Sequence, residues 1–280
     1  MVIIISAISK LMNKSFLERL ISGIVLVIVA IVTITFGGNV LFATTLIISL
    51  IGLSEMYNVL NIRNSLIAYT GYAATIAFYA FIRFGMEKHL MPLFIAFLLV
   101  VMAVYVFTFP KYTCDKAVFV FFGLFYVSVM LSYIYQLRMM EDGIYLVWLI
   151  FLCSWGCDTC AYLAGVMFGK HKMAPVLSPK KSIEGAVGGV AGAALLGFIY
   201  ATLFKNNMGG MSSPQIMVPV TCAVAGLISM VGDLAASGIK RNYDIKDYGK
   251  LIPGHGGILD RFDSVIFTAP IIYYLIQYMQ

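Results

Sequence analysis

The residues best suited to chemistry lie in one polar segment near the C-terminus, from Ser237 to Asp263. Two acids in it, Asp260 and Asp263, are three positions apart, so on a helix they share one face. Carboxylates that converge in this way suit a hard divalent cation such as Mg²⁺. We therefore predict that Asp260 and Asp263 bind a metal ion.

Glycines and bases surround these two acids. Gly254, Gly256 and Gly257 flank His255 and allow a tight turn whose backbone N–H groups point at an anion. The bases of the segment can neutralise several phosphate charges; they are Lys240, Arg241, Lys246 and Arg261. Taken singly, each residue fits a solvated loop beside the membrane, with acids that cap a helix. Together, the acids, bases and glycines favour phosphate chemistry.

Two further acids, Asp158 and Asp233, lie inside apolar runs. Burying a carboxylate in a membrane is costly, so such an acid is a candidate functional residue that should face a polar cavity. We predict that Asp233 joins Asp260 and Asp263 at the metal, with a pairing to Lys240 as the alternative. For Asp158, a buried hydrogen bond to a neighbouring helix is the competing interpretation.

A second polar segment covers residues 169–185. Ser178 followed by Pro179 predicts a helix start with Ser178 as its N-cap. Lys180 and Lys181 would then lie in the first turn, where cations oppose the helix dipole unless an anion binds there. The alternative is the ordinary excess of Lys and Arg in the cytoplasmic loops of membrane proteins.

The elements that position these segments must be membrane helices. Of the 280 residues, 61% are hydrophobic and only 11% are charged, whereas a soluble domain is about 25% charged. Apolar runs of about 20 residues span a bilayer as helices, and their lack of alternation argues against a barrel. We predict an all-α polytopic membrane protein with about nine transmembrane helices. The runs are 20–36, 40–60, 65–84, 90–109, 117–137, 143–168, 186–204, 214–236 and 263–279.

Charge placement predicts the orientation of these helices. Along the nine runs, 15 of the 19 Lys and Arg residues fall on the side of the N-terminus, which places that side in the cytoplasm. Both polar loops, 169–185 and 237–262, lie on it. The same excess of Lys and Arg accounts for the net charge of +6, so this charge does not indicate nucleic-acid binding. The five cysteines lie mostly in apolar runs and predict neither a disulfide framework nor a metal site.

The two halves of the chain differ in polarity. Seven of the 13 acids and both basic loops fall in residues 143–280. We therefore predict that residues 1–142 are membrane-anchoring spans and that residues 143–280 form the catalytic region.

The segment 237–263 resembles, without a gap, the signature of the phosphatidate cytidylyltransferase (CDP-diacylglycerol synthase) family. The positions that carry this likeness are Ser237, Ile239, Lys240, Arg241, Lys246, Asp247, Gly249, Ile252, Pro253, His255, Gly256, Gly257, Ile258, Asp260, Arg261, Phe262 and Asp263. Two shorter groups are also similar to the family: Trp155, Asp158 and Tyr162, and Ser178 to Lys181 with Glu184 and Gly185. The resemblance covers about residues 143–280.

The resemblance implies a Mg²⁺-dependent enzyme that condenses CTP with phosphatidic acid to give CDP-diacylglycerol and pyrophosphate. It also implies a second cation such as K⁺, a homodimer and a bacterial plasma (inner) membrane. The metal ligands would be Asp233, Asp260 and Asp263. The catalytic residues would be Asp158, Lys240, Arg241, Lys246, Asp247, His255 and Arg261. The substrate-binding residues would be Ser178, Lys180, Lys181, Glu184, Gly256 and Gly257.

Two other functions compete with this one. An ion-coupled membrane transporter would use Asp158 and Asp233 as intramembrane relay acids, but it would have no need of the dense Lys, Arg and Gly loop. Another membrane enzyme of nucleotides or lipid phosphates, such as a lipid-head kinase, is the closer alternative.

Overall fold

The computed structural model of the chain describes residues 14–279. Residues 1–13 lie outside this part, and with them Lys10, one of the 15 Lys and Arg residues counted on the side of the N-terminus. The helices are α2 (Lys14–Phe36), α3 (Gly38–Val59), α4 (Leu66–Arg83), α5 (Leu90–Phe107), α6 (Cys114–Gly123), α7 (Met130–Arg138), α8 (Gly143–Leu146), α9 (Trp148–Phe151), α10 (Cys157–Phe168), α11 (Ile183–Phe204), α12 (Pro214–Asn242) and α13 (Leu259–Met279). Two π-helical segments, Leu124–Val129 and Leu152–Gly156, and two short 3₁₀ turns, Glu87–His89 and Lys205–Asn207, join some of them.

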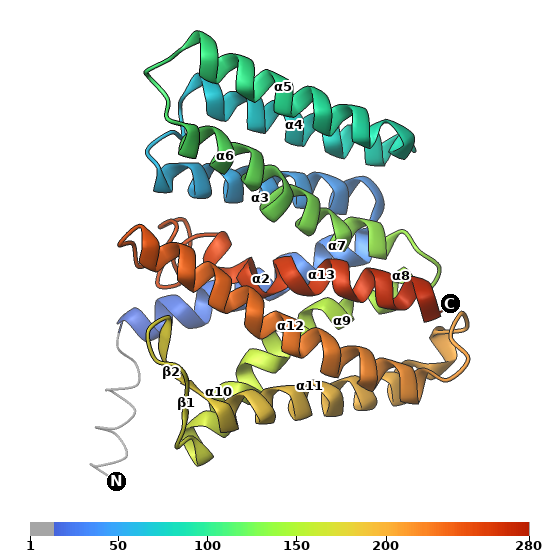
Figure 1. The fold of residues 1–280 in the computed structure, drawn as a ribbon. Helices are drawn as coiled ribbons and strands as arrows, with labels where there is room; N and C mark the ends of the chain where they lie inside the picture. Colours follow the sequence, from blue (N-terminus) through green and yellow to red (C-terminus); the bar gives the residue numbers. More distant parts are fainter. Residues whose placement is uncertain (1–13, 280) are drawn as a thin grey trace.

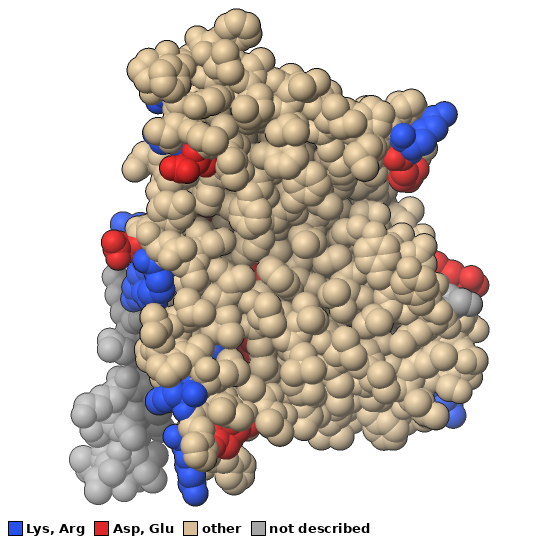
Figure 2. Space-filling view, in the orientation of Figure 1, with Lys and Arg blue, Asp and Glu red and all other residues tan. Residues whose placement is uncertain are grey.

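The prediction of an all-α polytopic membrane protein is confirmed. Within residues 14–279, seven helical stretches are long and apolar enough to cross a membrane. Figure 2 shows the matching surface: charged side chains gather at the edges of the visible face, and the area between them is almost entirely uncharged.

The count of nine spans is not confirmed. The apolar part of α2, Leu20–Phe36, is shorter than the seven stretches. Helix α13 carries Asp260, Arg261 and Asp263 in its first two turns. These charges lower the mean hydropathy of α13, which is not among the seven stretches although many of its residues are buried.

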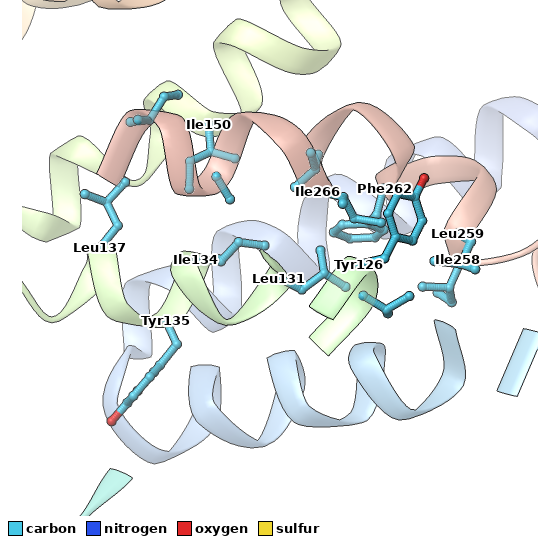
Figure 3. Packing of buried hydrophobic residues seen from close by; sticks show 14 of the residues in the cluster. Tyr126, Leu131, Ile134, Tyr135, Leu137, Ile150, Ile258, Leu259, Phe262 and Ile266 are labelled. Atoms are coloured by element: carbon cyan, nitrogen blue, oxygen red, sulfur yellow. The ribbon is translucent and has the colours of Figure 1, made fainter. Parts of the chain in front are cut away.

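Helix α13 joins the two halves of the chain. It packs against α12 and also against α7, α9 and α3 (Figure 1). Leu131 and Ile134 of α7 lie opposite Phe262 and Ile266 of α13 in the close view of the core (Figure 3). The first two turns of α13, which contain two of the predicted metal ligands, Asp260 and Asp263, therefore belong to a helix that is held by both halves.

The helix start predicted at Ser178 is wrong. Residues Lys172–Ala174 (β1) and Ser178–Ser182 (β2) form a two-stranded antiparallel hairpin instead. Helix α11 begins after it, with Ser182 as the N-cap: its Oγ accepts a hydrogen bond from the Gly185 N–H at 3.1 Å. Lys180 and Lys181 thus lie on a strand beside the helix and not in its first turn.

Candidate active site

A cavity of about 600 Å³ opens where α10, the hairpin, α11, α12 and α13 meet. It brings together most of the polar residues singled out in the sequence. They are Asp158, Ser178, Lys180, Lys181, Asp233, Lys240, Asp247, Asp260, Arg261 and Asp263. Residues more than 100 positions apart thus line one polar cavity.

The other predicted site residues lie around this cavity. Lys246, His255 and Gly256 line a neighbouring cavity of about 630 Å³, which also includes Asp247 and Arg261. Arg241, Glu184 and Gly257 line neither of the two cavities. Glu184 instead holds the β1–β2 hairpin: its carboxylate accepts from the His171 ring at 2.5 Å and from the Lys170 N–H at 3.1 Å.

Three acids of the main cavity form an electrostatic cluster. Asp263 interacts with both Asp158 and Asp233, and Asp158 also interacts with Asp233. Lys181 offsets part of this negative charge, since its Nζ lies 2.5 Å from an Asp233 carboxylate oxygen. The Ser264 hydroxyl donates to Asp158 at 3.2 Å. Asp158 therefore belongs to the cluster, and it also makes the hydrogen bond to another helix that was its alternative interpretation.

Asp260 differs from its neighbours because it is fully engaged by the protein. One carboxylate oxygen accepts from Lys240 Nζ at 2.9 Å, and the other from the backbone N–H groups of Tyr248 at 2.8 Å and Gly257 at 2.9 Å. The side chain is buried. Lys240 lies in the last turn of α12 and Asp260 in the first turn of α13, where each charge also suits its helix dipole. These contacts favour a role for Asp260 as the anchor of the loop.

The predicted tight turn is present around His255. Gly256 has a φ of +82°, which an L side chain rarely adopts. The Ile252 N–H donates to the Gly256 carbonyl at 2.8 Å. However, the Gly257 N–H donates to Asp260. This part of the turn binds the protein's own carboxylate, where we expected a substrate phosphate.

Tyr248 ties the same loop to α12. Its hydroxyl donates to the Ala236 carbonyl at 3.1 Å, and Lys240 Nζ lies 5.5 Å from the centre of its ring. Burial raises the pKa of the Tyr248 phenol, so the hydroxyl stays protonated and keeps donating at neutral pH. The loop between α12 and α13 is therefore fastened at several points.

Glu55 of α3 is the site-building residue that sequence reasoning missed. The residue is only 9% exposed, and its carboxylate accepts from the backbone N–H groups of Ile258 at 3.0 Å and Leu259 at 2.9 Å. Gly249 and Gly257 both pack so closely on this carboxylate that a Cβ at either position would collide with it. The signal was present, since Glu55 is an acid inside an apolar run, as Asp158 and Asp233 are.

Helix α2 contacts the loop as well. The Ser22 hydroxyl lies 2.6 Å from His255 Nδ1, and Arg261 donates through Nε to the His255 carbonyl at 3.0 Å. The indole of Trp155 donates to the Arg261 carbonyl at 3.2 Å. The loop is thus held from α2 and α3, which both belong to the half predicted to be an anchor only.

Comparison with known proteins identifies the family of the chain. A family model described as "Cytidylyltransferase family" matches residues 17–279. The chain belongs to the cytidylyltransferase family. The phosphatidate cytidylyltransferase of Staphylococcus aureus (strain COL) is 33% identical over 264 residues, which are 91% of this chain and 96% of that protein. The phosphatidate cytidylyltransferase of Bacillus subtilis (strain 168) is 33% identical over 193 residues, or 69% of each chain. The family predicted from the sequence is confirmed, and the match extends through the first half.

A cytidylyltransferase handles phosphates, and the acid cluster offers the donors that a divalent cation needs. Asp158, Asp233 and Asp263 present hard oxygen ligands to one cavity and repel one another, so their chemistry fits such an ion. As the side chains lie, no group of three His, Cys, Asp or Glu residues within 14–279 encloses a metal position. Asp260, with both oxygens engaged, is the predicted ligand with the least freedom to turn toward one.

Proposed function

We propose that this protein transfers the cytidylyl group of CTP to phosphatidate, giving CDP-diacylglycerol and pyrophosphate. One observation carries the proposal: a single cavity at one end of the membrane helices collects acids and bases from distant parts of the chain. The resemblance of the polar segments and the likeness to phosphatidate cytidylyltransferases over most of the chain support the same reaction.

In this reaction, a phosphate oxygen of phosphatidate attacks the α-phosphorus of CTP and pyrophosphate leaves in line. Transfers of this kind depend on positioning and charge neutralisation more than on covalent catalysis. Arg261 and Lys240 border the main cavity from its loop side, and Lys180 and Lys181 border it from the hairpin. We assign Lys240 to the triphosphate, Arg261 to the junction of the triphosphate and the lipid phosphate, and the hairpin lysines to the lipid phosphate or CTP. The attacking phosphate is already ionised, so no general base is required.

The acid cluster would hold a divalent cation, for which we propose Mg²⁺. Asp233 and Asp263 would be ligands, with Asp158 beside them. When bound, such an ion neutralises phosphate charge and supplies Lewis-acid stabilisation. The role of Asp260 as a metal ligand and the second cation, K⁺, stay predictions from the resemblance.

We also propose that the hairpin and the loop between α12 and α13 face the cytoplasm, where CTP is found. The excess of Lys and Arg on that side of the helices supports this orientation. For bacterial relatives, the membrane would be the plasma (inner) membrane. The homodimer implied by the resemblance stays a prediction.

The experiment uses purified full-length protein with CTP, Mg²⁺ and phosphatidate in detergent micelles. We expect pyrophosphate release that requires the lipid and is lost in Asp263→Asn. Asp244→Asn is the matched control, because Asp244 is an exposed acid in the loop before α13. Asparagine tolerates its φ of +51° well. Release without lipid, or an equal loss in both variants, would refute the proposal. Ion flux in liposomes without nucleotide would instead support the transporter alternative.

A further inference from the structure

We infer that a groove beneath α2 holds an acyl chain of the lipid substrate, with the lipid phosphate beside Arg261. This inference rests on the proposed function and adds to it where the apolar part of the substrate lies. It assigns a binding role to α2 and α3, which the sequence suggested only as anchors.

The groove is an apolar cavity of about 260 Å³ in the membrane part of the molecule. Helix α2 forms one wall, and α3, α7, α9 and the start of α13 form the others. Its residues include Leu26, Ala30, Thr45, Phe151 and Trp155. Because five elements enclose it, this space differs from the outer surface of the helices, where lipid contacts a convex face.

The groove adjoins an intermediate cavity of about 410 Å³, which in turn adjoins the main cavity. Leu26 and Trp155 line both the groove and the intermediate cavity. The intermediate cavity in turn shares Asp158, Asp260, Arg261 and Asp263 with the main cavity. The path therefore changes from apolar to charged over a short distance, as the surface of a phospholipid does.

Arg261 stands at the junction of this path. Its side chain lines the main cavity, the intermediate cavity and the neighbouring cavity that contains Lys246 and His255. A phosphate that arrives from the groove meets the guanidinium from one side, and a nucleotide phosphate meets it from another. Arginine suits such a position because its planar fork can bind two phosphate oxygens at once.

The polar atoms in the wall of the groove are already satisfied. The hydroxyls of Thr33, Thr44 and Thr45 donate to the carbonyls of Val29, Val40 and Leu41, one turn back in their own helices, at 2.7–2.9 Å. An apolar cavity without such donors to spare does not hold water well. A hydrocarbon chain is the occupant that fits these walls.

The groove and the intermediate cavity together match one leaflet of a bilayer in length. The residues of α2 that line the two cavities run from Gly23 to Ile34, about 16 Å along the helix axis at 1.5 Å per residue. The hydrocarbon core of a bilayer is about 30 Å thick, so one leaflet is about 15 Å. An acyl chain that enters at the level of the phosphate would therefore end near Ile34.

The test measures kcat/KM for a long-chain phosphatidate (dioleoyl) and a short-chain one (dihexanoyl) at fixed CTP and Mg²⁺. Ala30→Trp would fill the groove from α2. We expect the ratio of long-chain to short-chain kcat/KM to fall about tenfold, the effect of exposing roughly two methylenes. Ile28→Trp is the matched control, because Ile28 lies on the same helix and is exposed, so this variant should keep the wild-type ratio.

An unchanged ratio in Ala30→Trp, or an equal fall in Ile28→Trp, would overturn the inference. If Ala30→Trp does not fold, the wild-type protein answers the question with a phosphatidate that carries a diazirine at the middle of one acyl chain. We expect crosslinks at Ala30, Thr45 or Phe151, and crosslinks only at outward positions such as Ile28 would contradict the groove. A wild-type protein that turns over neither lipid would instead refute the proposed function.

Discussion

Replacing Glu55 by alanine is expected to loosen the start of α13 and the loop before it. The carboxylate accepts two backbone hydrogen bonds, from Ile258 and Leu259, in a buried position. A hydrogen bond to a charged group contributes about 1.5–3 kcal/mol. Losing both lowers the free energy of local opening by about 3–6 kcal/mol, which corresponds to roughly 10²- to 10⁴-fold in the opening equilibrium.

Hydrogen exchange measures this opening directly. In Glu55→Ala, we expect the amides of residues 257–263 to exchange faster by about two to four orders of magnitude. Glu55→Gln keeps one acceptor oxygen, so its effect should be about half of this in free energy. Glu87→Ala is the control, because Glu87 is an exposed acid in the same half of the chain.

The activity should follow the exchange. Asp260, Arg261 and Asp263 come directly after the two amides that Glu55 holds, so kcat should fall in the order wild type, Glu55→Gln, Glu55→Ala. The reasoning is refuted if exchange in residues 257–263 changes no more in Glu55→Ala than in Glu87→Ala. It is refuted equally if the loop loosens and kcat does not change.

Three further outcomes are expected. Asp260→Asn should lower the free energy of unfolding by about 3–5 kcal/mol, because it removes the charge partner of Lys240, whose side chain is only 14% exposed. Adding Lys240→Met should recover part of this loss in a thermal-unfolding double-mutant cycle, and strictly additive losses would contradict the pair. Gly257→Ala should lower kcat, because the new Cβ would collide with the Glu55 carboxylate. Gly238→Ala should leave kcat unchanged, because its Cβ would meet only a leucine methyl at 3.6 Å. Equal effects of the two substitutions on kcat would count against this packing. Removal of divalent cations with EDTA should abolish pyrophosphate release, and excess Mg²⁺ should restore it; release that persists after chelation would contradict the proposed metal.

The convergence of the acids could be predicted from the sequence because the rule behind it is energetic. A carboxylate in an apolar run needs a polar neighbourhood, so Asp158 and Asp233 were both expected to face polar space, and Asp233 was expected beside Asp260 and Asp263. The same rule applied to Glu55, but we did not predict a role for this acid because it lies in the half of the chain expected only to anchor the protein in the membrane. Only the fold brings α3 beside the start of α13.

The details of each site residue depended on partners that are distant in sequence. Asp260 and Asp263 share a helix turn, yet Asp260 binds Lys240 and two loop amides and Asp263 does not. Sequence spacing cannot predict that difference, because it depends on how the loop between α12 and α13 folds against Asp260. The prediction of a helix start at Ser178 was wrong for a related reason. A Ser-Pro pair often begins a helix, but here the segment pairs with Lys172–Ala174 and is therefore extended.

The most direct test of the central claim follows the phosphates of CTP. Purified protein is supplied with phosphatidate, Mg²⁺ and CTP labelled either at the α- or at the γ-phosphate. Cytidylyl transfer predicts that the α-label enters the lipid and that the γ-label appears only in pyrophosphate. A γ-label in the lipid would mean that the protein is a lipid kinase, and no label in the lipid from either position would contradict the transfer altogether.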